Sequence, residues 1–155
     1  METPESMKAE LATWNNGAGI DIESWVGCMG NFSLAVGYIS VFWPEFVLFD
    51  GYILRKGFSE ESLRAFERQQ GATRQSVEWV MNHLHIADIH SGSCEDGSKD
   101  KVALLGNVLK EIYQAKLSRQ WPDRPCNVVF QIPEDEDDLI EYQLSFWQKS
   151  HEAKV

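Results

Sequence analysis

Glu45-Phe-Val-Leu-Phe-Asp-Gly-Tyr-Ile-Leu-Arg55 places an Asp-Gly dipeptide between two short runs of strand-favouring residues. Aspartate and glycine both tolerate the positive φ angles that a two-residue hairpin turn requires. This stretch therefore predicts a β-hairpin with its turn at Asp50-Gly51. A helix that continues past Pro44 is the alternative.

A second hairpin is predicted towards the C-terminus. Residues 126–132 are rich in strand formers, and residues 140–146 alternate apolar with polar side chains, which is typical of a half-buried strand. Residues 133–138 would then connect the two strands. Two hairpins that pair into a small antiparallel sheet, packed against several amphipathic helices, predict an α+β fold whose strand order is left open.

Capping residues and apolar spacing predict helices around these hairpins. Ser59 and Thr73 precede amphipathic segments, and each is suited to accept a hydrogen bond from the exposed amides at a helix start. Asp100 is expected to cap a third helix, which Trp121-Pro122 ends. These helices supply the apolar faces that cover a small sheet.

A long stretch without charged residues runs over residues 26–44. Apolar side chains within residues 32–43 follow helical spacing between Asn31 and Pro44, and we expect them to form the most buried helix. Glycine, asparagine and serine residues interrupt the stretch, which favours a buried core segment over a membrane span.

The chain length of 155 residues fits one domain with a single core. We expect a single domain over residues 1–155, in which three segments are set apart. They are a peripheral segment at residues 1–20, an exposed polar loop at residues 91–100 and a frayed tail at residues 148–155.

The charge balance restricts the classes of partner. Lys and Arg number 14 against 24 Asp and Glu, which gives a formal net charge of −10. Such a surface repels nucleic-acid backbones and anionic membranes, so neither is expected as a partner. It attracts a basic protein, and simple solubility is the alternative explanation of the charge.

The cysteines and the N-terminus indicate the compartment. The three cysteines are widely spaced, at Cys28, Cys94 and Cys126, and no two of them form a C-x-x-C pair. Their odd number and their spacing disfavour a disulfide framework. Acidic residues stand near the N-terminus where a secretory signal would carry basic ones. We therefore expect a cytoplasmic protein.

Residues 83–90 read His-Leu-His-Ile-Ala-Asp-Ile-His and contain three of the four histidines. Imidazole and carboxylate groups are ligands of divalent transition metals such as zinc. His83, His85, Asp88 and His90 are therefore the candidate metal ligands.

A shared metal site depends on where the preceding helix ends. If it ends near Asn82, then His83-Leu84-His85 is extended and both imidazoles lie on one face. Leu84 continues the apolar stripe of the helix, and this favours the alternative in which helix persists and the two rings point to nearly opposite sides. In that case the histidines mark a helix C-terminus, where positive charge is favoured.

Residues 134–138 form an acidic run, and they are Glu134, Asp135, Glu136, Asp137 and Asp138. The run lacks the spaced ligands and central glycine of an EF-hand loop. We expect these carboxylates to meet Lys or Arg side chains of a protein partner, and a solvated turn is the alternative.

Four further stretches carry a resemblance. They are Phe42-Trp-Pro-Glu-Phe-Val47, Val80-Met-Asn-His-Leu-His-Ile86, Leu109-Lys-Glu-Ile-Tyr-Gln-Ala-Lys-Leu117 and Trp121-Pro-Asp-Arg124. Together they resemble a group of small bacterial proteins of unknown function, over most of residues 30–147. The resemblance implies a bacterial cytosolic domain, and it assigns neither an activity nor a site residue.

The sequence therefore favours a non-enzymatic, acidic protein-binding domain without a cofactor. An immunity or inhibitor protein that neutralises a basic partner is the specific form that we expect. The alternative is a metal-dependent hydrolase that uses His83, His85, Asp88 and His90 to activate a bound water. A structural subunit without a separable activity is a third hypothesis.

Overall fold

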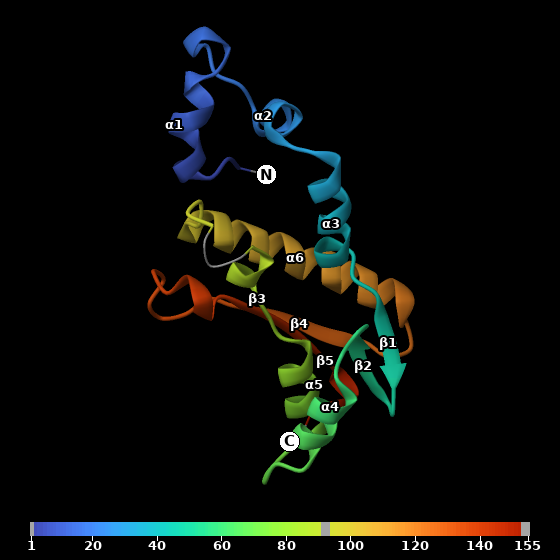
Figure 1. The fold of residues 1–155 in the computed structure, drawn as a ribbon. Coiled ribbons are helices and arrows are strands. Elements are labelled where there is room, and N and C mark those ends of the chain that lie inside the picture. The colour runs from blue at the N-terminus through green and yellow to red at the C-terminus, as the bar shows by residue number, and fades with distance from the viewer. Residues whose placement is uncertain (1, 91–93, 153–155) are drawn as a thin grey trace.

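A computed structural model describes residues 2–90 and 94–152 (Figure 1). The helices are α1 (Glu5–Thr13), α2 (Ile22–Met29), α3 (Phe32–Phe42), α4 (Glu60–Glu67), α5 (Arg74–Asn82) and α6 (Lys99–Gln120). The strands are β1 (Phe46–Phe49), β2 (Tyr52–Arg55), β3 (Leu84–His85), β4 (Cys126–Gln131) and β5 (Gln143–Gln148). Short 3-10 helices are η1 (Asn15–Gly17), η2 (Ile86–Ile89), η3 (Leu139–Glu141) and η4 (Lys149–His151). The predicted α+β class is confirmed.

The first predicted hairpin is confirmed. Strands β1 and β2 pair antiparallel with Phe49 opposite Tyr52. Asp50 and Gly51 between them have φ angles of 49° and 83°. Positive φ at both turn positions matches the twist of the flanking strands, so the dipeptide fixes the register of the hairpin.

The second hairpin is also confirmed, although its second strand starts later than expected. Strands β4 and β5 pair antiparallel from Cys126 opposite Gln148 to Gln131 opposite Gln143. Ile140 belongs to η3 instead, and its side chain is exposed. Residues 133–138 lie in the connection between the strands, as predicted, and η3 lengthens that connection.

The two hairpins form separate sheets rather than one. Strands β1 and β2 make a two-stranded sheet, and the second sheet has the order β3-β5-β4. The expectation that both hairpins share one sheet is corrected by this topology. Helix α5 lies between β2 and β5. Its side chains form hydrogen bonds with the backbone groups that direct pairing of these two strands would use.

Glu78 and Asn82, which we call the polar seam, join the facing edges of β2 and β5. Glu78 Oε1 accepts a hydrogen bond from the Ile53 amide at 2.8 Å, and its Oε2 accepts one from the Gln148 amide at 2.8 Å. The Asn82 side-chain amide donates to the carbonyls of Ile53 at 2.9 Å and Phe146 at 3.3 Å. Because side chains satisfy these buried backbone groups, no further strand is required there.

Helix α6 supplies one wall of the main core. Its buried apolar side chains are Val102, Leu109, Tyr113 and Leu117. They pack with residues of β1, β2, β4 and β5, among them Phe46, Ile53, Val128 and Phe146. The helix ends at Gln120, before Trp121-Pro122 as predicted, because proline cannot continue the backbone hydrogen bonds.

The helices α4 and α5 begin as their capping residues predict. The Ser59 side chain accepts a hydrogen bond from the Ser62 amide, and Thr73 and Ser76 form a reciprocal capping box. Both helices pack over a smaller core that includes Tyr52, Leu54, Leu63 and Val77. Together with β2 they form the lower part of the molecule in Figure 1.

Asp100 does not cap α6 as predicted, because that helix begins at Lys99 after Ser98. Its carboxylate instead fastens α1 to α6, accepting hydrogen bonds from the Ser6 amide at 2.8 Å and the Ser6 hydroxyl at 2.9 Å. These bonds hold the pKa of Asp100 well below its usual range, with the Ser6 amide as the largest cause. The charged carboxylate therefore anchors the N-terminal helix.

The prediction that residues 32–43 form the most buried helix is wrong. Helices α2 and α3, both fully described, bury none of their residues, and Phe32 is 93% exposed. The uncharged run over residues 26–44 is therefore not a core segment. In Figure 1, α1, α2 and α3 form an arch above α6, and α3 meets α6 only near its lower end. Helical spacing identifies an apolar face, but burial also requires an opposing surface.

The C-terminal segment corrects a further expectation, because Gln148, the first residue of the expected frayed tail, closes β5 and is 1% exposed. His151 Nδ1 donates a hydrogen bond to Glu78 Oε2 at 2.8 Å. Gln148 and His151 thus hold this segment against α5, and residues 153–155 lie outside the described residues. No helix within the described ranges has the length and apolar character needed to cross a membrane.

Candidate functional site

The most unusual surface of the molecule lies on α2 and α3. Asp21 accepts a hydrogen bond from the Ser24 amide at 2.7 Å and begins α2, and Asn31 accepts one from the Leu34 amide at 2.9 Å and begins α3. Gly30 lies at the break, where an added Cβ would stand 2.6 Å from the Val26 carbonyl oxygen. The local sequence therefore specifies two helices with a sharp bend between them.

Large apolar side chains gather on these two helices and remain exposed. Seven of the ten exposed large hydrophobic residues within the described ranges fall in residues 26–43. We call them the apolar face: Val26, Met29, Phe32, Leu34, Val36, Ile39 and Trp43. Exposed apolar side chains that gather in this way mark interaction sites more often than scattered single residues do.

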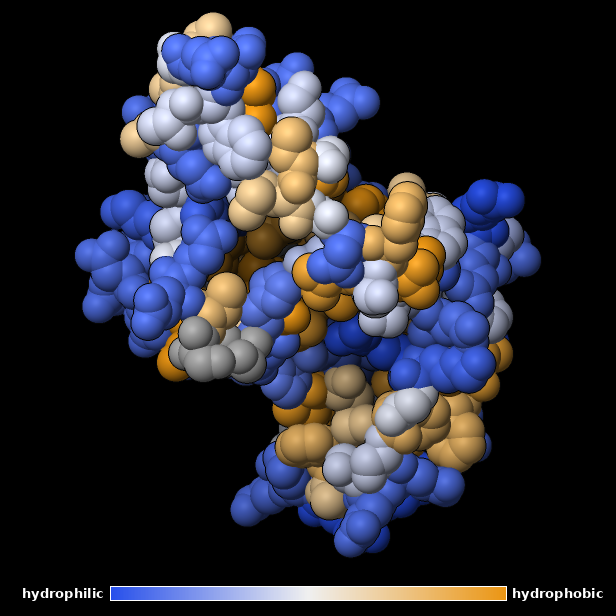
Figure 2. All heavy atoms as spheres, turned by 45° about the horizontal axis from the view of Figure 1, so that its top comes forward, coloured by the Kyte–Doolittle hydropathy of each residue, from blue (hydrophilic) through white to orange (hydrophobic). Residues whose placement is uncertain are grey.

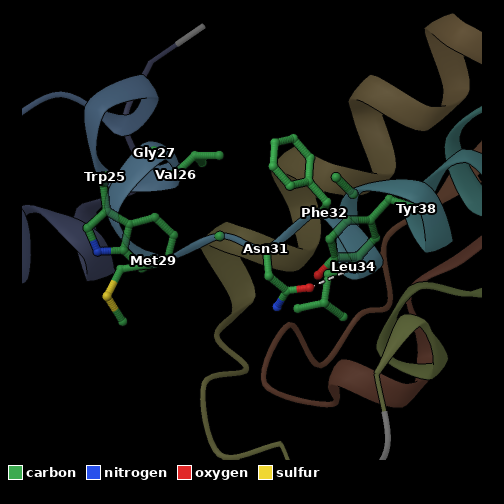
Figure 3. A pocket seen from close by; sticks show the side chains of 10 residues that line it. Trp25, Val26, Gly27, Met29, Asn31, Phe32, Leu34 and Tyr38 are labelled. Carbon is green, nitrogen blue, oxygen red and sulfur yellow. Dashed lines mark hydrogen bonds between the residues drawn. The ribbon is translucent and has the colours of Figure 1, made fainter.

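A hollow of about 490 Å³ opens between the two helices (Figure 3). Trp25 and Met29 of α2 line one side, and Phe32, Leu34 and Tyr38 of α3 line the other. Figure 2 shows hydrophobic side chains gathered on this side of the molecule and around a hollow in it. Its size and apolar lining suit one or two large apolar side chains of another molecule.

The charges around the apolar face are all negative within its own part of the chain. No Lys or Arg occurs from residue 9 to residue 54, whereas Glu10, Asp21 and Glu23 lie next to α2 or within it. Glu10 also accepts a hydrogen bond from the Trp25 indole at 2.8 Å, which holds that ring beside the hollow. The face is therefore apolar at its centre and acidic at its N-terminal border.

The acidic run Glu134–Asp138 lies in the connection between β4 and β5, and all five residues are exposed. Lys99 Nζ stands 3.8 Å from a carboxylate oxygen of Glu136 and 3.6 Å from one of Asp137. Asp138 accepts a hydrogen bond from the Ile140 amide, so part of the run shapes its own turn. The remaining carboxylates give this end of α6 an exposed negative surface.

The structure places two of the four candidate metal ligands side by side. Helix α5 ends at Asn82, and His83 follows in an extended conformation with φ −67° and ψ 143°. The interpretation that Leu84 continues the helix is therefore wrong, because Leu84 begins β3 and pairs with Leu144. The rings of His83 and His85 lie with their centres 5.2 Å apart.

The other two candidate ligands, Asp88 and His90, are not part of this pair. Asp88 is exposed on η2. His90 Nε2 forms a hydrogen bond with the Tyr38 hydroxyl at 2.8 Å, which connects η2 to α3. Within residues 2–90 and 94–152, no group of three or more His, Cys, Asp or Glu side chains is arranged to hold a metal ion.

A buried acid–imidazole pair was not singled out by the sequence. Glu78 is fully buried, and its Oε2 accepts a hydrogen bond from His151 Nδ1. The second ring nitrogen of His151 accepts one from Arg74 at 3.2 Å, and Arg74 lies over the Tyr52 ring. Both nitrogens of the imidazole are thus occupied by protein groups, so this pair stabilises the fold rather than offering a free base.

The apolar face was also missed as a site, although its signal was visible. The run of residues 26–44 without a single charge was interpreted as core, whereas only Tyr38, Val41, Phe42 and Pro44, all in its C-terminal half, are half-buried or buried. The rest of the run carries most of the exposed surface described above.

Comparisons of the chain with protein-family models, with curated proteins and with solved structures found no match.

Proposed function

We propose that this chain is a non-enzymatic protein-binding domain that docks a basic partner on its apolar face. The observation that carries the proposal is the exposed, uncharged surface of α2 and α3 in a chain of net charge −10. The partner is a protein with an apolar patch surrounded by Lys and Arg. An immunity or inhibitor protein that covers the basic working surface of its target is the form we favour.

The apolar face supplies the affinity in this proposal. Burying a large apolar side chain contributes on the order of 1.5–3 kcal/mol. Phe32 and Trp43 are the strongest candidates, because aromatic side chains dominate the energetics of many interfaces. The Phe32 side chain is almost completely exposed, so a partner could bury nearly its whole surface.

The acidic groups supply orientation and encounter rate. Attraction between oppositely charged surfaces accelerates association and is screened by salt. The acidic run Glu134–Asp138 and Asp100 both lie at the start of α6, where Ser6 fastens α1. A basic partner that reaches from the apolar face towards this end would meet both kinds of surface.

Site-specific photo-crosslinking tests the proposal. A crosslinking amino acid replaces Phe32, and the same amino acid at Glu111, an exposed position of α6, serves as the matched control. We expect one basic protein to be captured from native cells through position 32 at low salt and not through position 111. Its measured affinity should fall with rising salt, after Phe32→Ser, and after neutralisation of the acidic run by Asn and Gln.

Three outcomes would contradict the proposal. One is capture of a second copy of this chain through position 32, which would assign the face to self-association. Another is a captured partner that is acidic or that binds independently of salt. The third is equal capture through positions 32 and 111, which would show that the partner does not bind preferentially at the apolar face.

A further inference from the structure

We propose that His83 and His85 form a two-histidine site for one late first-row divalent metal ion, of the Cu²⁺, Ni²⁺ or Zn²⁺ class. The site does not depend on the protein-binding function proposed above. It is carried by the backbone conformation, by the hydrogen bonds of both imidazoles and by the spacing of the two rings.

The backbone brings both rings to one side of the chain. Helix α5 ends at Asn82, and His83 and His85 both have extended backbone angles. In extended chain, residues two positions apart point to the same side, so Leu84 between them points to the other. Leu84 packs against the main core, which fixes the orientation of the segment.

The hydrogen bonds define which ring nitrogen is free. His83 Nδ1 lies 2.5 Å from the Val80 carbonyl oxygen, and His85 Nδ1 lies 2.6 Å from the Ile140 carbonyl oxygen. A carbonyl only accepts, so each Nδ1 carries a proton, and in the neutral imidazole the lone pair is then on Nε2. Metal-binding histidines characteristically donate their other N–H to a carbonyl or carboxylate in this way.

The spacing of the rings matches a shared ion. With metal–nitrogen bonds of about 2.0–2.1 Å and tetrahedral angles, two imidazoles on one ion have ring centres about 5 Å apart. The centres of the His83 and His85 rings are 5.2 Å apart, and their planes are inclined by 86°. The two rings are therefore already at the separation that a common ion demands.

Exposure and ligand type define the class of ion. His83 is exposed, and His85 is half-buried on β3, an edge strand of its sheet, so water molecules have access to complete the coordination. Imidazole ligands favour Cu²⁺, Ni²⁺ and Zn²⁺ over Mg²⁺ and Ca²⁺, which prefer oxygen. The two-histidine set stands apart from His90, whose Nε2 is engaged by Tyr38.

Calorimetric titration of the tag-free full chain with Ni²⁺ tests the site. We expect one ion per chain, and His83→Gln or His85→Gln should each weaken binding at least about tenfold. Glutamine retains a donor for the carbonyls of Val80 and Ile140, so these variants should keep the fold, which circular dichroism checks. The matched control His90→Gln removes an exposed imidazole of the same segment and should leave the affinity unchanged.

Electron paramagnetic resonance of the Cu²⁺ complex supplies an independent readout. Two equivalent imidazole nitrogens should couple to the copper in the wild-type chain, and the second should be lost in either single variant. Equal affinity of the wild-type chain and the His83→Gln/His85→Gln double variant would overturn the proposal. An effect of His90→Gln as large as that of His83→Gln would overturn it as well.

Discussion

Helices α5 and α3 reverse the usual distribution of polar and apolar side chains. Helix α5 buries Glu78 and Asn82, whereas α3 leaves Phe32 almost wholly and Val36 mostly exposed to solvent. The difference lies in what stands opposite each helix. Strand edges with unpaired backbone groups face α5, while α3 touches α6 only near its C-terminal end. Burial in this molecule is thus determined by an available partner and not by residue type alone.

The partners of the buried polar side chains are numerous. Glu78 accepts hydrogen bonds from the Ile53 amide, the Gln148 amide and side chain, and His151. At the C-terminal end of α3, the anchoring contacts come from α6: the Tyr113 hydroxyl donates to the Val41 carbonyl at 3.1 Å, and Lys116 donates to the Trp43 carbonyl at 3.2 Å. Lys116 also lies over the Trp43 ring, so these contacts hold the C-terminal end of α3 and leave Phe32 and Val36 exposed.

Replacing Glu78 should produce the largest effect. Glu78→Ala leaves buried donors of β2 and β5 without an acceptor, and we expect the free energy of unfolding to fall by about 3–5 kcal/mol. Urea denaturation followed by tryptophan fluorescence measures this loss. The control Glu111→Ala removes an exposed carboxylate of α6 and should change stability by less than about 0.5 kcal/mol. Similar losses in the two variants would contradict the role of the polar seam.

Two phenylalanines allow the same comparison with apolar side chains. Phe146→Ala removes a fully buried ring that packs edge-on against Phe46, and it should cost about 3–5 kcal/mol. Phe32→Ala removes an exposed ring and should cost less than about 0.5 kcal/mol. Thermal unfolding of both variants measures the difference, and a large loss for Phe32→Ala would mean that α3 is covered in solution.

Two glycines should respond to the same substitution with opposite signs. A Cβ at Gly106 of α6 would lie 2.1 Å from ring atoms of Phe130, so Gly106→Ala should destabilise the protein by about 1–3 kcal/mol. At Gly37 of α3, the added Cβ would meet no described atom within 4 Å apart from the nearby backbone of α3 itself and the two neighbouring residues. Gly37→Ala should therefore stabilise α3 by up to about 1 kcal/mol, because alanine favours helix. The midpoints of thermal unfolding should move in opposite directions.

The reactivity of the three cysteines compares a buried position with exposed ones without any substitution. Burial raises the pKa of Cys126 in β4 to about 12, so at pH 8 only about one molecule in ten thousand carries the reactive thiolate there. Cys28 on α2 and Cys94 are exposed. We expect iodoacetamide to modify these two in the native protein and Cys126 only after unfolding, as peptide mass spectrometry measures. Rapid modification of Cys126 in the native state would show that β4 opens readily.

The features that could be predicted from the sequence are local ones. Asp50-Gly51 defines its hairpin because both residues accept positive φ, and Ser59 and Thr73 begin helices because their side chains satisfy amides three residues away. These signals act over a few residues and do not depend on the rest of the chain. They yielded the first hairpin and the starts of α4 and α5.

The features that could not be predicted depend on distant partners. Glu78 resembles an ordinary charged helix residue, and its burial is caused by backbone groups at positions 53 and 148. The end of α5 at Asn82 has the same origin, because the Asn82 side chain bonds to β2 and β5 while the chain turns into β3. Whether His83 and His85 share a side was thus determined by strands that the local sequence does not reveal.

The polar seam also protects the protein against its own copies. A strand edge with free N–H and C=O groups is a template on which another chain can add a strand. Glu78 and Asn82 occupy such groups on Ile53 of β2 and on Phe146 and Gln148 of β5. The two side chains that keep the sheets from merging within one molecule therefore also keep those edges from recruiting a strand from a neighbouring molecule, which is the first step of aggregation.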